Sequence, residues 1–336
     1  RATRPGEDGP GLRSLRMTGV ESRSALPHSR TNALTHFRSL LAAPSARLYT
    51  FRMPERRDDL PIPPPPRERG PSMLDLVRLS RETVFPPGGE DLYRRIAQLT
   101  DLVPENEVLD AACGRGVSTL YLARTFGVTG VGIDSDRVLV QEAYSRARDA
   151  DFEGVSFETA PLDDLPFKDG TFDVAIGEIG LAASADPARA VAELARVTRP
   201  HGCVVLIQLI WTGHVDPNRR EILVQHLGAR PMILVEWKQL LRDAGVVDLT
   251  VEDWSDAPSP FRPTAGGGAP FPDFSEIFSL RERIAILFRA WRRWGWGGVK
   301  GAVLREREIH RLLTRERVLG LSMIKGTKWP VDLTEA

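Results

Sequence analysis

The chain has 336 residues and a formal net charge of zero, because 45 basic side chains balance 45 acidic ones. A chain of this length can bury a full hydrophobic core, and its two cysteines exclude a disulfide framework and a four-cysteine metal site. No apolar run reaches the roughly 18 residues of a membrane span, so we expect a protein of the cytoplasm.

Charge is distributed unevenly along the chain. Residues 1–70 carry 13 arginines against 7 acids, and residues 255–318 carry 12 basic side chains against 7 acids, which leaves 20 bases and 31 acids in the rest. Ten of the 26 prolines fall within 1–70, where no apolar periodicity is sustained. We therefore expect a disordered basic leader. A transit peptide, or an over-extended reading frame with its real start at Met53 or Met73, is the alternative.

Helical and strand patterns alternate after the leader. Apolar spacing predicts helices near 73–81 and 90–99, followed by strands and helices in alternation through Ile210, which is typical of a parallel sheet. A helix over 231–244 and a strand over 246–254 complete the series.

Residues 108–119, VLDAACGRGVST, join a short apolar run to a glycine turn and then a helix start. In an α/β sheet this is where a nucleotide-like ligand binds. A strand ending at Leu109 delivers Asp110 to the carboxyl edge, while Gly114 and Gly116 let the backbone pass close to a ligand. Thr119 stands where the dinucleotide fingerprint has its third glycine, which disfavours a nicotinamide or flavin cofactor.

A second strand is predicted over 130–135, ending in Asp134. One carboxylate can accept hydrogen bonds from both hydroxyls of a ribose, and such charge-assisted bonds are stronger than neutral ones. Asp134 is therefore our first candidate for holding the ribose of a nucleoside ligand, together with Ser135.

Two further segments follow in order: LPFKDGTFDVAI over 165–176 and LARVTRPHG over 194–202. With the two preceding motifs, they resemble the class I S-adenosylmethionine-dependent methyltransferases over about residues 75–255. The resemblance implies an α/β fold, a Rossmann-like, seven-stranded and mostly parallel sheet whose last strand is antiparallel. It divides the chain into a methyltransferase domain over 71–254, an insertion over 255–318 and the last strand over 319–330. Ala112 and His201 replace glycines that are common in the family.

The same resemblance implies which residues bind S-adenosyl-L-methionine. Asp110 is expected to orient the methionine end, although an acid before the first turn of a helix is also favoured by the helix dipole alone. The backbone of the glycine turn is expected to line the cofactor, and residues of the segment after the third strand to meet the adenine, unless both of its acids are simply solvated. These turn and adenine residues are Ala112, Cys113, Gly114, Gly116, Leu162 and Asp163. The thiols of both cysteines are expected to be packing groups.

Candidate catalytic residues lie on loops at the carboxyl edge. Glu178 after the fourth strand and His214 after the fifth, with Asp216 beside it, can each accept a proton from an O–H or N–H nucleophile; a solvated histidine is the alternative for His214. Tyr93 is either a lid over the cofactor or a half-buried packing aromatic. Asp173 begins a strand and is expected to serve the fold.

The insertion is predicted to form a helical hairpin interrupted by Gly295, Gly297 and Gly298. Its apolar positions are Leu280, Ile284, Leu287, Phe288 and Trp291, with Ala302, Ile309, Leu312 and Leu313 on the second helix. The hairpin is either a cap on the sheet edge or, because tryptophans alternate with arginines, a membrane-surface contact through 280–318. No nucleic-acid partner is expected.

These observations predict methyl transfer from S-adenosylmethionine to a small, apolar or amphipathic acceptor at oxygen, nitrogen or carbon. The loop 177–181, GEIGL, lacks the paired glutamates of protein arginine methyltransferases and the Pro-Pro-Tyr loop of amino-directed nucleic-acid methyltransferases. A binding protein without turnover and an enzyme that transfers another group from the same cofactor remain the alternatives.

Overall fold

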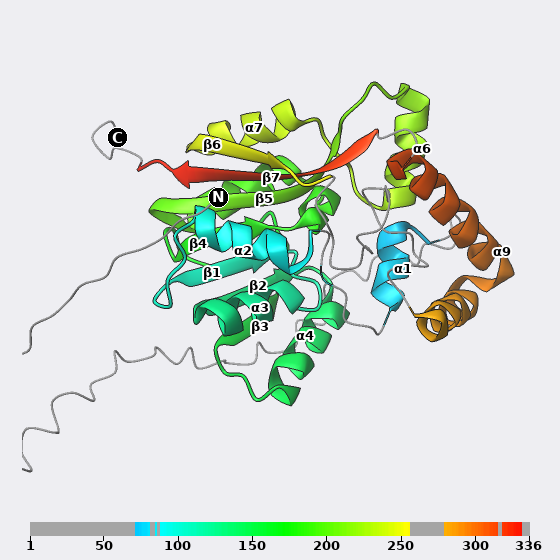
Figure 1. Ribbon diagram of the computed structural model, residues 1–336, viewed down its shortest axis with the longest axis horizontal. Helices are drawn as coiled ribbons and strands as arrows, with labels where there is room; N and C mark the ends of the chain where they lie inside the picture. The colour runs from blue at the N-terminus through cyan, green and yellow to red at the C-terminus, as the bar shows by residue number, and fades with distance from the viewer. Residues whose placement is uncertain (1–70, 81–84, 86–87, 256–278, 315–317, 331–336) are drawn as a thin grey trace, which may run out of the picture. The chain divides into compact units, whose positions relative to one another are not determined.

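The computed structural model describes residues 71–80, 85, 88–255, 279–314 and 318–330. The predicted leader lies outside these residues. Seven strands form one sheet in the order β3-β2-β1-β4-β5-β7-β6 (Figure 1). The strands are β1 (Glu107–Ala111), β2 (Thr129–Asp134), β3 (Val155–Thr159), β4 (Phe172–Gly177), β5 (Thr198–Trp211), β6 (Val246–Asp253) and β7 (Leu319–Lys328).

Parallel pairing joins β3, β2, β1, β4 and β5, and β7 runs antiparallel between β5 and β6. The predicted fold class is therefore confirmed, including the antiparallel last strand. The helices between and around the strands are α1 (Met73–Leu79), α2 (Gly89–Leu99), α3 (Val117–Phe126), α4 (Arg137–Asp149), the short 3-10 helix η1 (Ile179–Ala183), α5 (Pro187–Val197), α6 (Pro217–Leu227), α7 (Leu234–Asp243) and α9 (Leu280–Thr314).

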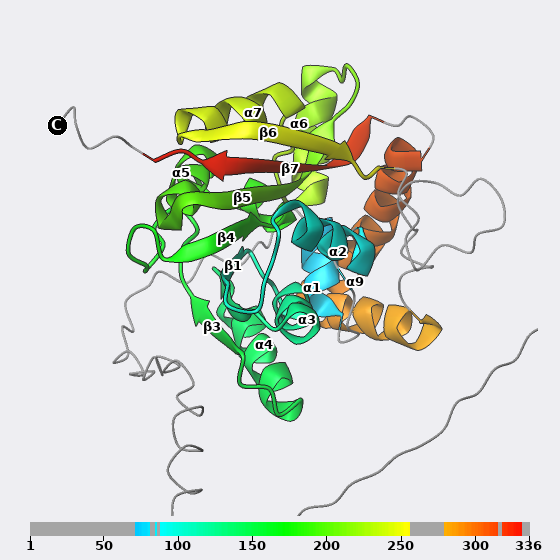
Figure 2. The same ribbon diagram turned by 60° about the vertical axis from the view of Figure 1, so that its left-hand side comes forward.

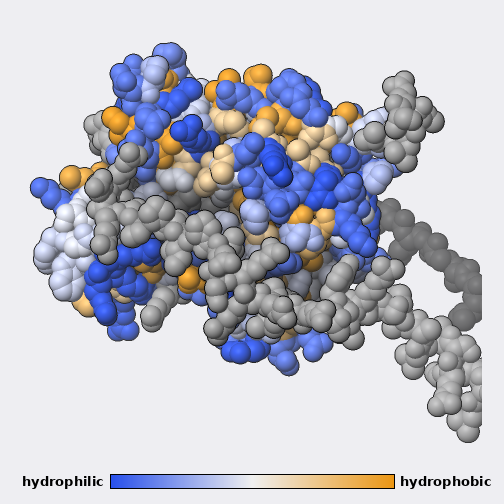
Figure 3. Space-filling model, turned by 180° about the vertical axis from the view of Figure 1, so that it is seen from behind, coloured by the Kyte–Doolittle hydropathy of each residue, from blue (hydrophilic) through white to orange (hydrophobic). Residues whose placement is uncertain are grey.

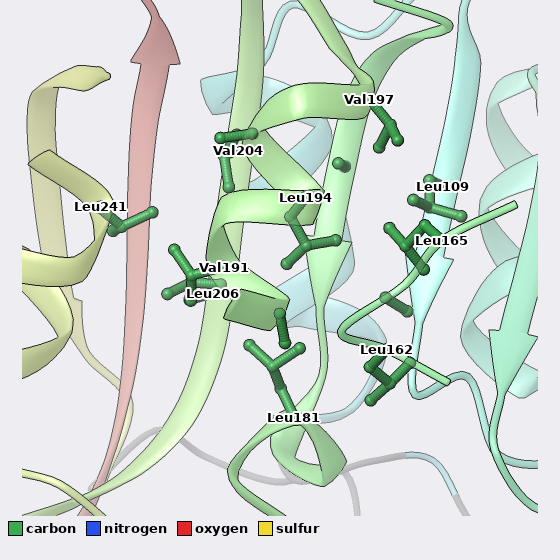
Figure 4. Packing of buried hydrophobic residues seen from close by; sticks show 14 of the residues in the cluster. Leu109, Leu162, Leu165, Leu181, Val191, Leu194, Val197, Val204, Leu206 and Leu241 are labelled. Atoms are coloured by element: carbon green, nitrogen blue, oxygen red, sulfur yellow. The ribbon is translucent and has the colours of Figure 1, made fainter. Parts of the chain in front are cut away.

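Both faces of the sheet are covered, because successive strand residues point to opposite sides. Leu109 and Leu206 face a core completed by α5 and α7 (Figure 4), whereas Val108 and Val205 face a second core completed by α2 and α3. The near-continuous apolar runs of β1, β4 and β5 follow from this double burial.

Two residues at family glycine positions have left-handed backbone. Ala112 has φ 65° and His201 has φ 65°. An L side chain in that region costs about 1–2 kcal/mol, which explains why glycine is common at both positions.

Replacing His201 by glycine should therefore raise the free energy of unfolding by about 0.5–1 kcal/mol, since the relief of backbone strain exceeds glycine's larger loss of chain entropy. The exposed His201 ring contributes one edge contact to Trp329, at 6.4 Å between centroids. Urea denaturation of the variant measures the effect. His214→Gly is the control, because exposed His214 has no left-handed φ; if both variants lose stability equally, the strain argument is wrong.

The insertion does not form the predicted hairpin. Its described helix, α9, bends at Gly295 (φ 68°, ψ −170°), and Figures 1 and 2 show the two halves meeting at a corner rather than lying side by side. The first half packs on α1 through Ile286 and Ala290, which are buried with Leu76. The side chains of Ala302, Ile309, Leu312 and Leu313 lie outside the described residues.

The apolar positions named from the sequence do not form the packed face of α9. Leu280, Ile284, Phe288 and Trp291 are exposed, and Leu287 is half-buried. The first half of α9 carries two apolar stripes, and their spacing alone does not distinguish the buried stripe from the exposed one. Polar contacts accompany this apolar packing: Arg289 donates to Glu282 (2.8 Å) and to the carbonyl of Leu79 at the end of α1.

Candidate functional site

Three acidic side chains meet at the carboxyl edge of the sheet. Asp110 lies in β1, Asp134 ends β2, and Glu178 directly follows β4. These strands are parallel neighbours, and Asp110 pairs with Gly132 on one side and Ile176 on the other. All three acids are buried, at 0%, 7% and 4% exposure. Among the described residues none of the three carboxylates forms an ion pair.

Asp110 is held by one of its two oxygens. The hydroxyls of Ser118 and Thr119, in the first turn of α3, each donate to Oδ2 at 2.6 Å. Oδ1 is buried and has no hydrogen-bond partner in the described part of the chain. Burial raises the pKa of Asp110 to about 6, against the bonds from Ser118 and Thr119, which lower it. A buried carboxylate oxygen without a donor is costly, so this atom marks a place for a ligand's donor group.

Asp134 closes the glycine turn from the next strand. Its Oδ2 accepts from the backbone N–H of Gly114 at 2.9 Å, and its Oδ1 accepts from the N–H of Asp136 at 2.8 Å. Each oxygen keeps a further lone pair for an outside donor. Burial raises the pKa of Asp134, and the two backbone bonds oppose that increase. Ser135, the next residue, is exposed beside it.

Gly114 and Gly116 lack a side chain for different structural reasons. Both have left-handed backbone, with φ 54° at Gly114 and 66° at Gly116. A Cβ on Gly114 would meet nothing within 4 Å, whereas one on Gly116 would lie 2.4 Å from the ring of Phe157 and 3.0 Å from Ala143. Gly114 therefore leaves space that a ligand can use, and the absent side chain of Gly116 lets α3 pack beside β3 and α4.

Cys113 serves packing, as predicted for its thiol. It is buried with Leu120, Val140 and Phe157, and a Cβ on Gly132 of β2 would lie 2.9 Å from its Sγ. Burial raises the pKa of the thiol well above its ordinary value. Its backbone N–H donates to the carbonyl of Ile133 (3.0 Å), which ties the turn to β2.

Glu178 shares a buried network with Tyr93. The Tyr93 hydroxyl donates to Oε1 of Glu178, and Gln208 of β5 donates to the carbonyls of Gly177 (3.0 Å) and Glu178 (2.8 Å). Burial raises the pKa of Glu178 well above its ordinary value, and the charge of Asp110 adds to that increase. Tyr93 is fully buried, so the prediction of a half-buried aromatic was wrong, and its hydroxyl is a partner of Glu178.

His214 follows the end of β5, which is longer than the neighbouring parallel strands. Gly177 pairs with Leu206, and β5 continues for five more residues to Trp211, a further rise of about 16 Å. His214 follows in an exposed loop. Asp216 caps α6 by accepting from the N–H groups of Asn218 (2.9 Å) and Arg219 (3.2 Å), which accounts for that acid structurally.

The predicted adenine segment lies beside the end of β2, because Ala160 N–H donates to the carbonyl of Asp134 at 3.3 Å. The Leu162 side chain points into the core beside Leu165 (Figure 4), which leaves its backbone as the group available to a ligand. Asp163 is half-buried in the same turn. Asp173 serves the fold as expected, since its carboxylate accepts from Arg199 and from the N–H of Glu107.

Residues that the sequence did not single out complete the site. Ser118 and Thr119 fix Asp110, and Thr119 was considered only for the glycine it replaces. Arg115, inside the glycine turn, donates to the carbonyls of Arg78 and Ser80 at the end of α1 and to Glu142 of α4. Hydroxyls eight and nine residues after a strand-end acid, and an arginine between two turn glycines, are the signals that could have predicted these roles.

The residues present fit a cationic ligand with hydroxyl donors. Three buried carboxylates repel one another, Asp110 Oδ1 has no donor, and Gly114 leaves open space. An ammonium and a sulfonium supply the missing positive charge, and a ribose supplies donors to Asp134. Within the described residues no group of three or more His, Cys, Asp or Glu side chains is placed to hold a metal ion.

Comparison with known proteins indicates a methyltransferase. A family model described as a methyltransferase domain matches residues 108–202. Methyltransferase GfsG of Streptomyces halstedii is 28% identical over 228 residues, covering 66% of this chain and 77% of that protein. The cyclase SpnF is a structural neighbour, with TM-score 0.57, 22% identity, and coverage of 72% of this chain and 81% of SpnF; at that identity it shows a common fold.

The chain covers different fractions of the length of its relatives. The chain covers only 32% of an uncharacterised 37.1 kDa protein encoded in a transposon of Streptomyces fradiae, at 36% identity over 113 residues, or 33% of this chain. It covers 68% of the O-methyltransferase resE of Aspergillus sclerotiorum, at 30% identity over 181 residues, or 53% of this chain. The family model and the relatives agree with the fold and with the three acids at the carboxyl edge of the sheet. The chain belongs to the class I S-adenosylmethionine-dependent methyltransferases.

Proposed function

We propose that the protein transfers the methyl group of S-adenosylmethionine to a small, apolar or amphipathic acceptor, and that Glu178 takes the proton that the acceptor loses. The observation that carries this proposal is the buried network in which Asp110, with one oxygen lacking a donor, lies next to the Tyr93–Glu178 pair. A cofactor-binding acid and a proton acceptor are thus held at one edge by neighbouring strands.

The cofactor-binding part uses the chain's own donors and acceptors. Asp110 Oδ1 would accept from the cofactor's ammonium, and Asp134, with Ser135 beside it, would accept from the ribose hydroxyls. The backbone of Ala112 and Cys113 would line the methionine end across the space left by Gly114. The Leu162 backbone and the Asp163 carboxylate would meet the adenine. When bound, S-adenosylmethionine supplies an electrophilic methyl group on a positively charged sulfur.

The acceptor part rests on Glu178. Methyl transfer is an in-line displacement, so the protein's main task is to align donor and acceptor and to exclude water. A buried carboxylate fixed by Tyr93 can take a proton from an O–H or N–H nucleophile without reorganising. The name of resE as an O-methyltransferase supports an oxygen acceptor. His214, in its exposed loop, stays a secondary prediction, as does location in the cytoplasm; the described residues contain no helix long and apolar enough to cross a membrane.

Calorimetric titration of the full chain with S-adenosylmethionine and S-adenosylhomocysteine tests the cofactor assignment first. A screen of quinones, sterols and phenols with labelled methyl donor then tests transfer. Micromolar binding of both compounds, followed by a labelled product, is expected. Binding with no labelled product from any acceptor class would favour the binding-protein alternative, and transfer of a different group would favour another transferase.

Asp134→Ala should weaken binding of S-adenosylmethionine by about 1.5–3 kcal/mol, the range for losing a charged hydrogen-bond partner, or roughly 10- to 150-fold in Kd. Part of the loss comes from the freed Gly114 N–H. Calorimetric titration measures it. Asp164→Ala is the control, because that exposed acid lies one residue beyond Asp163; equal affinities in all three proteins would refute the ribose assignment.

A further inference from the structure

The first half of α9 has an apolar face that no described element covers. Leu280, Ile284 and Phe288 are 65%, 60% and 54% exposed, and Trp291 is 40% exposed. At about 100° per residue these four side chains fall within an arc of roughly 80°. Ile286 and Ala290, which pack on α1, lie on the opposite side of the helix. The exposed stripe is therefore additional to the stripe that holds α9 on the protein.

Aromatic contacts extend this stripe around the bend. The ring centroids of Phe288 and Trp291 are 5.6 Å apart, and those of Trp291 and Trp296 are 6.1 Å apart. Trp296, just beyond Gly295, is 76% exposed. The left-handed φ of Gly295 thus places a third aromatic ring at the end of the stripe. We call Leu280, Ile284, Phe288, Trp291 and Trp296 the outer ridge.

Positive charge borders the outer ridge. Arg281 and Arg292 are exposed and lie next to it on the helix. The only acid between residues 280 and 304 is Glu282, which is buried and paired with Arg289. In Figure 3 the corner of α9 lies at the left of the view, where pale surface adjoins strongly hydrophilic surface.

We propose that the outer ridge docks the protein on an anionic lipid surface. Exposed aromatic and aliphatic side chains on one face of a helix, flanked by arginine, suit the boundary between headgroups and acyl chains. Each nearby arginine gains about 1 kcal/mol from negative lipid charge. A second copy of the chain is disfavoured as the occupant, because its ridge would bring the same positive border against this one.

Trp294 does not belong to this surface, although its place among the arginines suggested that it did. It is half-buried, packs with the Leu76, Ile286 and Ala290 cluster, and has the Arg293 guanidinium 5.0 Å above its ring. Variants of Trp294 would therefore report on the fold of α9 and not on lipid contact.

The outer ridge is one helix away from the glycine turn. Arg289 of α9 and Arg115 of the turn both donate to carbonyls at the end of α1. A lipid surface held against α9 would bring a dissolved amphipathic acceptor near the carboxyl edge. This consequence rests on the proposed function, but lipid docking itself does not.

Flotation of the full chain with vesicles tests the proposal. Binding is expected to vesicles that contain phosphatidylglycerol in phosphatidylcholine, and not to phosphatidylcholine alone. Phe288→Ser with Trp291→Ser should lower the partition coefficient by at least about tenfold, and Arg281→Gln or Arg292→Gln by about fivefold each. The control pair Val138→Ser and Val235→Ser removes equally exposed apolar groups from α4 and α7, and should leave binding unchanged.

Three results would overturn the proposal. The wild-type chain could fail to float, the ridge variants could float like wild type, or the ridge variants could change only a concentration-dependent dimer seen in sedimentation velocity. The last result would assign the face to a second copy. Titration of each variant with S-adenosylmethionine separates the two hypotheses: unchanged cofactor affinity with lost flotation supports docking on lipid, and a chain that binds lipid but no cofactor contradicts only the proposed function.

Discussion

Glu178→Gln is expected to reduce kcat for methyl transfer by about 10²- to 10⁴-fold, the usual contribution of a positioned general base. The glutamine has the same shape, and its carbonyl can still accept from Tyr93, so the buried network should persist. Cofactor affinity should stay near the wild-type value, because Asp110 and Asp134 are untouched. Transfer of a labelled methyl group to an acceptor found in the screen gives kcat, and calorimetry gives the affinity.

The pH dependence separates a base from a merely structural residue. Glu178 must be ionised to take a proton, and burial raises its pKa above the ordinary 4.5. Activity should therefore rise with pH, and the acidic limb of the pH–activity profile should lie at a higher pH than that value. The Tyr93 hydroxyl lowers the pKa of Glu178, and Tyr93→Phe should therefore move the limb to still higher pH. The control is Glu158→Gln on β3, an exposed carboxylate away from the network. Unchanged kcat in Glu178→Gln would mean that alignment alone accounts for catalysis.

The sheet was predictable because its signals are local and repeated. Apolar runs followed by an acid mark the ends of β1 and β2, and both acids lie at the carboxyl edge as expected. The helix predicted over 231–244 begins only at Leu234. The Glu236 carboxylate caps the N-terminus of α7 by accepting from the N–H of Ile233. Boundaries of this kind depend on side-chain geometry that apolar spacing does not contain.

The site was predicted less completely, because its contacts join distant segments. Tyr93 and Glu178 are 85 residues apart, and their hydrogen bond depends on how α2 packs across the sheet. The reason for Gly116 lies in the ring of Phe157, on another strand. The resemblance to a family predicted Gly116 as a residue beside the cofactor, whereas the packing shows a role in the core that the sequence did not reveal.

The exposed face of α9 illustrates the same limit. Its apolar periodicity correctly predicted a helix, but two stripes satisfy the same spacing. The inward stripe is the one that packs on Leu76 of α1, and Arg289 on that side bonds to Glu282 and to the carbonyl of Leu79. Such a decision depends on α1, more than 200 residues earlier in the chain.

Asp110→Asn should have opposite effects on binding and on stability. Without the charge of Asp110, the cofactor's ammonium has no anionic partner in the site. Removing one member of a buried charge pair costs about 2–5 kcal/mol, which corresponds to at least roughly a thirtyfold increase in Kd for S-adenosylmethionine. Without cofactor, the same carboxylate is a buried charge lacking an ion pair. Its removal should therefore stabilise the cofactor-free protein above pH 6.

The sign of the stability effect follows from the pKa. Burial raises the pKa of Asp110 from 3.8 to about 6, so the folded chain holds a proton that the unfolded chain has already released. The stabilisation from this group is complete below about pH 4 and is lost as the pH rises through about 6. The full gap corresponds to at most about 3 kcal/mol. An asparagine is uncharged at every pH, so it recovers part of this loss above about pH 4, where the wild-type protein loses it.

Scanning calorimetry of wild type and Asp110→Asn without cofactor, at pH 5 and pH 7.5, tests this directly. The variant should melt higher at pH 7.5, and its advantage should be about half as large at pH 5, because that pH lies between the pKa of Asp110 in the unfolded chain and its pKa in the folded chain. Saturating S-adenosylmethionine should reverse the order at pH 7.5, since only wild type gains binding energy. A variant that is less stable than wild type at both pH values would show that the hydrogen bonds from Ser118 and Thr119 depend on the charged carboxylate. These bonds would then offset the cost of burying the charge without any ligand.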